Sequence, residues 1–246
     1  MKYVAIFGAS SILARAIAVE LARLGYGLVL AGRERDEVEA VASDVQLRYG
    51  VPSHAVPFDA AEFATHGRSW EECRVITADA LVGVIVCFGY LGTQAEAEKD
   101  VEETRRTIDV NFTGATTILL WAANYLAKKK TGFICALSSV AGDRGRQSNY
   151  VYGAAKAGLT VFLQGLRNRL HRTGVTVTTV KPGFVDTHMT YGRPGMFLVA
   201  RPEKAAQKIV RAALKGRNVA YVPGFWRCIM TIICAIPETI FKRMRL

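Results

Sequence analysis

The chain has 246 residues, of which 50% are hydrophobic and 22% charged, and its formal net charge is +11. This length and composition predict one α/β domain with a sizeable core, and the positive charge favours anionic partners. No basic run alternates with aromatic residues, which argues against nucleic-acid binding. The five cysteines form no C-x-x-C pair, so we expect neither a metal site nor a disulfide framework.

The chain begins almost directly with an apolar run at residues 4–7, which predicts a strand. This leaves no room for a signal peptide, so we expect a cytoplasmic protein. Residues 11–24 follow with helical periodicity, and Gly25 ends the helix.

A glycine turn at residues 8–11, Gly-Ala-Ser-Ser, separates this strand from this helix. A turn of this kind at a helix amino terminus can hold a pyrophosphate with backbone N–H groups and serine hydroxyls. Ile12 and Ala14 stand where the usual spacing has glycines. The residues that we expect to bind a dinucleotide here are Gly8, Ser10, Ser11 and Ile12.

The second strand, at residues 27–31, is joined to a helix at residues 34–49 by a linker that contains Gly32 and Arg33. A carboxylate near the end of this strand would hold the ribose 2′-hydroxyl of NAD. Arg33 instead favours the additional phosphate of NADP, so we expect NADP(H), with NAD(H) as the alternative. A solvated Arg33 is the structural alternative.

The third strand, at residues 53–58, is followed by Asp59, and the fourth, at residues 81–87, is followed by Phe88 and Gly89. Both ends would lie at the carboxyl edge of a doubly wound sheet, where an adenosine binds. Asp59 is a candidate for the adenine amino group and Gly89 for close backbone approach. Ordinary turn chemistry explains either residue equally well.

Asn111 lies within a long helical region at residues 101–128. Asparagine is a poor helix former, and a buried one needs hydrogen-bond partners. We expect Asn111 to kink the helix and to hold a water that connects Lys156 to solvent.

The strongest candidates for chemistry follow a fifth strand, at residues 133–137, which ends at Ser138 and Ser139. On the next helix Tyr152 and Lys156 are four residues apart, so their side chains lie on one face. A neighbouring ammonium lowers the pKa of a phenol, which would let Tyr152 exchange protons near neutrality while Ser139 holds the same substrate oxygen. By itself, however, a Tyr and Lys pair at this spacing also occurs by chance.

A sixth strand at residues 175–180 precedes a turn that contains Thr187, a candidate for the nicotinamide carboxamide. Residues 188–202 are rich in Gly and Pro and indicate a mobile lid over the substrate. A helix at residues 204–215 and a short strand at residues 219–222 complete the pattern. It predicts a single doubly wound α/β Rossmann domain, residues 1–222, whose seven-stranded, mainly parallel sheet has helices on both faces.

Residues 223–246 form a hydrophobic and basic C-terminal tail. Its apolar run is shorter than the about 20 residues that cross a bilayer. It could lie in the membrane interface, with Trp226 and basic groups at headgroup level, or contact a sister subunit. Arg144 or Arg146 would then meet a lipid-linked phosphate, and the alternative for both is a solvated loop.

These spaced motifs together resemble the short-chain dehydrogenase/reductase family over residues 1–222. The resemblance implies catalytic roles for Asn111, Ser139, Tyr152 and Lys156, with Tyr152 and Lys156 also binding the cofactor. Cys87-Phe88-Gly89 departs from the family's asparagine-containing sequence. The positions that match the family's cofactor segments are Gly8, Ser10, Ser11, Asp59, Pro182, Gly183, Val185 and Thr187.

Residues 138–152 and 221–242 resemble the branch that contains the decaprenylphosphoryl-2-keto-β-D-erythro-pentose reductase. The resemblance implies a homodimer or homotetramer and an NAD(P)H-dependent carbonyl reductase of a lipid-linked keto sugar at the inner face of the cytoplasmic membrane. The alternatives are a soluble reductase of acyl or steroid-like ketones and a non-catalytic, nucleotide-sensing membrane adaptor.

Overall fold

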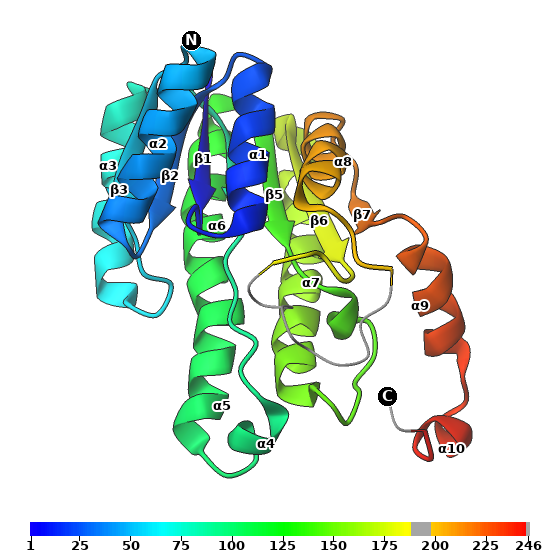
Figure 1. Cartoon of the computed structure of the whole chain (residues 1–246). Coiled ribbons are helices and arrows are strands. Elements are labelled where there is room, and N and C mark those ends of the chain that lie inside the picture. Colours follow the sequence, from blue (N-terminus) through cyan, green and yellow to red (C-terminus); the bar gives the residue numbers. More distant parts are fainter. Residues whose placement is uncertain (188–197, 245–246) are drawn as a thin grey trace.

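The computed structural model describes residues 1–187 and 198–244. Seven parallel strands form one sheet in the order β3-β2-β1-β4-β5-β6-β7, which confirms the predicted doubly wound α/β fold (Figure 1). Strand order reverses between β1 and β4, and such a reversal opens a crevice at the carboxyl ends of the strands. The strands are β1 Tyr3–Phe7, β2 Gly27–Gly32, β3 Ser53–Pro57, β4 Leu81–Val86, β5 Gly132–Leu137, β6 Val175–Pro182 and β7 Val219–Val222.

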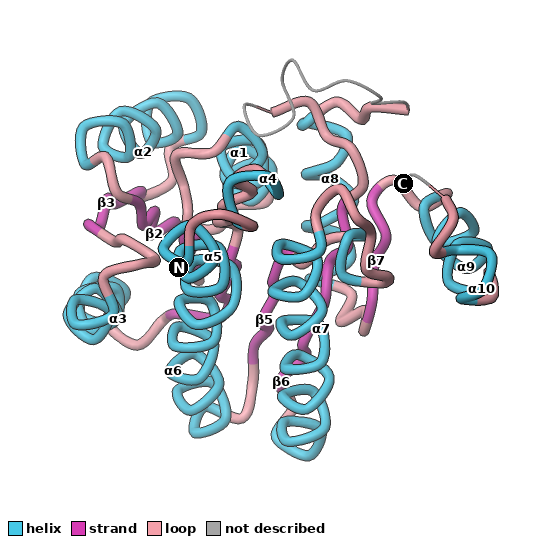
Figure 2. The backbone as a smooth tube through the Cα atoms, turned by 90° about the horizontal axis from the view of Figure 1, so that it is seen from below, coloured by secondary structure: helices cyan, strands magenta, loops and turns pink. Residues whose placement is uncertain are grey.

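Helices cover both faces of the sheet (Figure 2). Alternate residues of one strand enter different cores: Val4 and Ile6 pack with one set of helices, and Ala5 and Phe7 with the other. Strands buried on both faces read as continuous apolar runs, which is why the sequence predicted them well. One face carries α1 Ile12–Arg23, α2 Arg35–Tyr49 and α8 Pro202–Leu214, and the other carries α3 Phe63–Thr77, α6 Gly114–Lys129 and α7 Tyr150–Leu170.

Helix α3 was not anticipated from the sequence. Its buried residues include the polar side chains of His66, Ser69 and Thr77, so its inward face carries little apolar periodicity. These groups find acceptors within the fold, since Ser69 Oγ donates to Pro57 O at 2.6 Å and Thr77 Oγ1 to Cys73 O at 3.0 Å.

The long helical region is divided by a π-helical turn. α5 (Val101–Ile108) continues through a π-helical segment, Asp109–Thr113, into α6. Asn111 lies fully buried in this segment. The predicted disturbance of the helix at Asn111 therefore takes the form of a π turn, a feature that often marks functional sites.

After β7 the chain forms α9 (Trp226–Ala235) and α10 (Glu238–Phe241), which stand beside the sheet edge (Figures 1 and 2). Trp226 is only 2% exposed and packs with Val140 and Phe184. The prediction that Trp226 lies at headgroup level is therefore wrong, because its ring fills a cavity of its own chain. No helix in the described ranges has both the length and the apolar character that a membrane crossing requires.

Candidate active site

The end of β5 is fixed to α7 by two buried hydroxyls. The Ser138 and Thr160 hydroxyls are 2.7 Å apart, and both lie within hydrogen-bond distance of Lys156 O, at 2.9 and 3.0 Å. The strand end thereby sets the position of the helical turn that carries Lys156. Sequence reasoning missed this role of Ser138 and Thr160, and the only signal was two polar residues in apolar surroundings.

Ser139 starts a 3-10 helix, Val140–Gly142, at the carboxyl end of β5. Its Oγ accepts a hydrogen bond from Ala141 N at 3.1 Å. The hydroxyl proton of Ser139 can therefore be donated to another oxygen, as a substrate carbonyl would require.

Two glycines allow this 3-10 helix to lie directly against α7. A Cβ on Gly142 would be 2.7 Å from Lys156 C, and a Cβ on Gly153 would be 2.9 Å from Ala141 O. Both distances are too short for real side chains. The glycines therefore bring Ser139 close to the turn that contains Tyr152 and Lys156.

Lys156 is 3% exposed, and its Nζ donates to Leu137 O at 3.0 Å. The Nζ lies 5.8 Å from the centroid of the Tyr152 ring. Burial lowers the pKa of Lys156 to about 8, against a smaller opposing effect of the Cys87 thiol. The ammonium thus remains mostly protonated at pH 7 and places positive charge beside the phenol.

Tyr152 also lines a small hollow of about 20 Å³ at the start of α7. Gln94, Asn149 and Val151 line the same hollow, and Val151 N donates to Gln94 Oε1 at 3.2 Å. Gln94 belongs to a short helix, α4 (Gln94–Ala97), that follows the β4 loop. The phenol therefore lies where α7 meets this loop.

The amide of Asn111 is held by neighbouring backbone groups. Its Oδ1 accepts from Tyr90 N at 3.1 Å, and its Nδ2 donates to Tyr90 O at 2.5 Å and to Thr107 O at 2.8 Å. Both Nδ2 protons are thus used, which leaves only an Oδ1 lone pair for the predicted water. The structure shows Asn111 fixing the loop that follows β4.

The turn after β1 combines a required glycine with a helix amino terminus. Gly8 has φ +92°, and a Cβ there would lie 2.7 Å from Phe88. Ser11 Oγ accepts from Ala14 N at 3.1 Å as the N-cap of α1, so the first N–H groups of this helix face the carboxyl edge of the sheet. Ala14 stands where the usual spacing of the turn has a glycine, and it is fully buried, so its methyl group is not exposed at the turn. This turn fits a pyrophosphate.

Arg33 and Arg15 carry positive charge near this turn. Arg33 is exposed and forms no ion pair within residues 1–187 and 198–244. Arg15 Nε donates to Ser10 O at 3.1 Å, and its Nη2 lies 3.2 Å from Glu37 Oε2. Sequence reasoning overlooked Arg15, although its position one helical turn after Ser11 was a usable signal.

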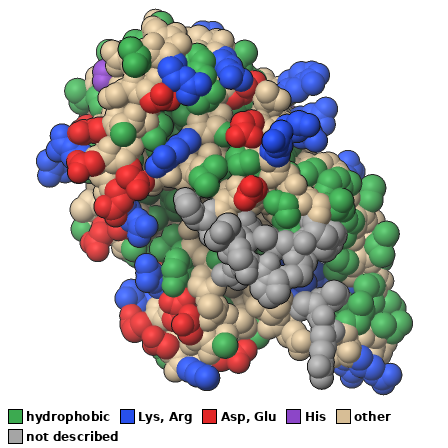
Figure 3. All heavy atoms as spheres, in the orientation of Figure 1, with side chains coloured by type: hydrophobic (Ala, Val, Ile, Leu, Met, Phe, Trp, Pro, Cys, Tyr) green, Lys and Arg blue, Asp and Glu red, His purple; other side chains and the backbone are tan. Residues whose placement is uncertain are grey.

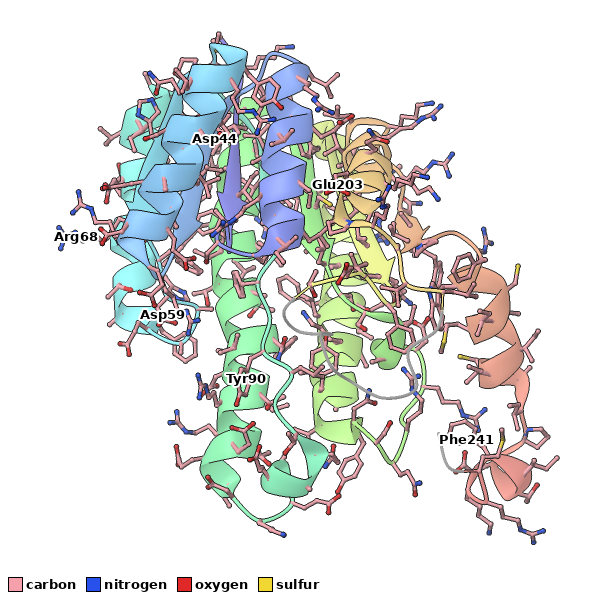
Figure 4. All side chains as sticks on the ribbon, viewed as in Figure 1. Asp44, Asp59, Arg68, Tyr90, Glu203 and Phe241 are labelled. Carbon is pink, nitrogen blue, oxygen red and sulfur yellow. The ribbon has the colours of Figure 1, made fainter. Side chains whose placement is uncertain are left out.

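Asp59 follows β3 and Gly89 follows β4, both at the carboxyl edge of the sheet, and Figure 4 labels Asp59 and Tyr90, the residue after Gly89. Asp59 Oδ1 accepts from Ala61 N at 2.9 Å, which is turn chemistry, and Gly89 is half-buried. Among residues 1–187 and 198–244 no donor reaches the second carboxylate oxygen of Asp59, which can therefore accept from a further donor.

The predicted nicotinamide segment, Pro182 to Thr187, packs against the C-terminal helix. Gly183 N donates to Val222 O at 3.0 Å, and a Cβ on Gly183 would lie 1.9 Å from Trp226 Nε1. Val185 is buried and bridges to Ala200. Residues 188–197 of the predicted lid lie outside the described residues.

Arg144 does not have the predicted phosphate-binding or solvated role. Its guanidinium donates to the carbonyls of Ile233 and Ile236 at 2.7 and 2.6 Å and to Glu238 Oε2 at 3.0 Å. It also lies 3.7 Å from the centroid of the Phe241 ring. Arg144 thus binds the carboxyl end of α9, where a cation is electrostatically favoured.

Comparison with known proteins agrees with this architecture. The family model for short chain dehydrogenase matches residues 2–194. An uncharacterized oxidoreductase of Mycobacterium tuberculosis is 33% identical over 242 residues, covering 98% of this chain and 96% of the relative. An uncharacterized oxidoreductase of Streptomyces coelicolor is 33% identical over 240 residues, covering 97% of this chain and 94% of the relative.

Two solved structures share the fold. A short-chain dehydrogenase from Sphingobium yanoikuyae in complex with NADPH has a TM-score of 0.82 and 24% identity, with 97% of each chain covered. A short-chain type dehydrogenase/reductase from Mycobacterium ulcerans has a TM-score of 0.81 and 18% identity, covering 99% of this chain and 98% of that one. The sequence matches, together with the doubly wound sheet, establish that this chain belongs to the short-chain dehydrogenase/reductase family of NAD(P)-dependent oxidoreductases.

Proposed function

We propose that the protein is an NADP(H)-dependent carbonyl reductase in which Tyr152 is the proton donor. The observation that carries this proposal is the buried ammonium of Lys156, which Leu137 O holds 5.8 Å from the Tyr152 ring. Such a charge stabilises the phenolate that forms when the proton leaves. Only one of the three Nζ protons is used by Leu137 O, and the others suit ribose hydroxyls.

The reduced nicotinamide, when bound, would supply the hydride that the carbonyl carbon accepts. Tyr152 would give its proton to the carbonyl oxygen, and Ser139 would orient this oxygen with the hydroxyl proton that its cap interaction leaves available. Lys156 would keep the resulting phenolate stable until it is reprotonated. Asn111 would position the β4 loop and offer its remaining Oδ1 lone pair to a water in the proton relay.

The preference for NADP(H) rests on charge at the end of β2. The strand ends at Gly32 where an NAD-binding protein would have a carboxylate, and the exposed Arg33 follows. Arg15 adds a second guanidinium beside the turn, although Glu37 shares it. The NADPH complex of the Sphingobium relative supports the same choice.

The substrate that we favour is the keto group of a sugar linked to polyprenyl phosphate. A stripe of exposed side chains along α9, Phe225, Cys228, Ile232 and Ala235, has a helical spacing of three, four and three residues. Phe225 is 39% and Ile232 68% exposed, and hydrophobic side chains gather over α9 in Figure 3 with basic side chains below them. This arrangement suits peripheral contact with an anionic membrane, where such a substrate would be found.

The test is a reductase assay with lipid-linked keto-pentose and with acyl and steroid-like ketones, using NADPH and NADH in parallel. We expect the Tyr152→Phe variant to lose turnover by a factor of about 10² to 10⁴ while it still enhances NADPH fluorescence. Full activity of this variant would refute the mechanism. Turnover of only the acyl or steroid-like ketones would refute the sugar substrate.

A further inference from the structure

A second hollow lies between the loop before α7 and the C-terminal helix α10, and its volume is about 250 Å³. Phe241, which contributes to it, is labelled on α10 in Figure 4. The lining side chains that matter for binding are Arg146, Tyr150, Glu238, Phe241, Lys242 and Met244.

The carboxylates in and beside this pocket are already paired. Glu238 accepts from Arg144 at 3.0 Å. Asp143 binds Lys181, and its Oδ2 accepts from the Tyr221 hydroxyl at 2.9 Å. Both carboxylates therefore already have partners, and Asp143 offsets only part of the desolvation of Arg146.

Two cations line the pocket, Arg146 and Lys242, and neither forms an ion pair in the part of the chain that the structure describes. Arg146 is half-buried, and its Nε is shielded from solvent and lacks a hydrogen-bond partner among the described residues. Desolvation lowers the pKa of this guanidinium, against a smaller opposing effect of the Asp143 carboxylate. A bound anion in the pocket would offset this desolvation of the guanidinium.

We propose that this pocket binds a phosphate ester, with Arg146 holding the phosphate oxygens, Lys242 adding charge at the rim, and Phe241 and Met244 contacting the apolar part of the ligand. A planar guanidinium matches phosphate oxygens in a two-pronged geometry, and Lys acts as a mobile point charge. The apolar wall suits an ester with a hydrocarbon chain better than inorganic phosphate.

Neighbouring residues at the start of α7 line this pocket and the hollow beside Tyr152. Tyr150 lines this pocket, and Asn149, Val151 and Tyr152 line the hollow beside the catalytic phenol. A substrate that extends across the intervening loop would place its keto group near Tyr152 and its phosphate at Arg146. In this form the inference rests on the proposed reductase function and identifies the anionic group of its substrate.

Arg144 builds this pocket without contacting its ligand. By binding the Ile233, Cys234 and Ile236 carbonyls it fixes the end of α9, and its stacking on Phe241 fixes the apolar wall. Arg144 is therefore a positioning residue, and Arg146 is the residue that would contact the phosphate.

The experiment measures binding of geranyl phosphate to the full-length chain without nicotinamide, by calorimetry, with geraniol as the uncharged comparison. Wild-type protein should prefer geranyl phosphate. Arg146→Gln should weaken this binding by about tenfold or more, and Lys242→Gln by several-fold, because each removes a charge-assisted contact. The matched control is Arg243→Gln, an exposed residue that follows Lys242 but does not line the pocket, which should change affinity by less than about twofold.

Two additional arms identify the source of the phosphate. Inorganic phosphate should compete only at much higher concentration than geranyl phosphate. Vesicles of phosphatidylglycerol should leave the Arg146-dependent affinity for geranyl phosphate unchanged. Displacement of geranyl phosphate by these vesicles would show that the pocket binds a lipid headgroup, and would overturn the proposal that it binds the phosphate of the substrate. The pocket assignment fails if wild-type protein binds geraniol and geranyl phosphate equally, or if Arg146→Gln and Lys242→Gln both bind like wild type.

Because these measurements need no turnover, they separate the pocket from the reductase mechanism. Suppose that phosphate binding depends on Arg146 but the Tyr152→Phe variant is fully active. The mechanism would then be contradicted, and the pocket assignment would remain valid. An active reductase that does not bind geranyl phosphate would contradict the pocket assignment and leave the mechanism intact. Circular dichroism of each variant verifies that the fold is retained.

Discussion

Helices α7 and α9 both contribute to the same end of the molecule, but they are held in place in different ways. α7 buries eight of its residues in the core, including Lys156, and Ser138 and Thr160 fix its backbone to β5. α9 buries only Trp226 and Met230 and depends on the Arg144 guanidinium at its carboxyl end. The proposed catalytic residues Tyr152 and Lys156 thus belong to a helix held by the core, whereas the C-terminal helices are held mainly by Trp226, Met230 and Arg144.

The largest expected effect is on the α7 side of this comparison. Lys156→Met keeps the side-chain volume but removes the charge that stabilises the phenolate, so we expect kcat/KM for carbonyl reduction to fall by about 10² to 10⁴. Steady-state kinetics measures this loss. A fall of less than about threefold would show that the ammonium is not needed.

The same substitution has a predicted signature in stability. Burial lowers the pKa of Lys156 from 10.5 to about 8, so between these two values the unfolded chain binds more protons than the folded chain. The free energy of unfolding of wild-type protein should therefore rise with pH across this window by about 3 kcal/mol relative to Lys156→Met. Urea titrations at pH 7, 8, 9 and 10 measure the difference, which should be absent if Lys156 titrates normally.

A smaller and local effect is expected on the α9 side. Arg144→Gln removes two short charge-assisted hydrogen bonds to carbonyls at the end of α9, each contributing about 1.5–3 kcal/mol, and an exposed ion pair with Glu238 that contributes less. We expect faster hydrogen exchange and proteolysis in residues 226–241, with the unfolding of the sheet almost unchanged. The exposed Arg243→Gln is the matched control, and equal protection in both variants would contradict the proposed dependence.

The smallest predicted effect concerns the link between the strand and α7. Ser138→Ala removes one buried hydroxyl and should lower the free energy of unfolding by about 1 kcal/mol, because Thr160 still reaches the Lys156 carbonyl. We expect kcat to fall several-fold with the KM for NADPH unchanged. Thr131→Ala, at an exposed position before β5, is the control and should change neither quantity.

The sequence predicted best what depends on neighbours close along the chain. Tyr152 and Lys156 are related by one helical turn, and the central strands appear as apolar runs because both of their faces are buried. The order of elements then determined the doubly wound topology.

Features that depend on residues far apart along the chain could not be predicted from the sequence. The acceptors of Arg144 lie 89 to 94 residues further along the chain, so no local pattern could reveal that this arginine binds the end of α9. Trp226 looked like a membrane-facing residue because the segment that buries it, Gly183 and Phe184, precedes it by about 40 residues. Helix α3 was missed for a different reason. Helical periodicity is recognised from apolar residues, and several residues on the buried face of α3 are polar.

The most direct measurement of the central claim is the pH dependence of kcat/KM for carbonyl reduction between pH 6 and 10. If a buried lysine with a pKa of about 8 stabilises the Tyr152 phenolate, wild-type activity should fall as pH rises through this value, and the residual activity of Lys156→Met should lack this limb. A wild-type profile that stays level from pH 7 to 10, or an identical limb in Lys156→Met, would contradict the claim.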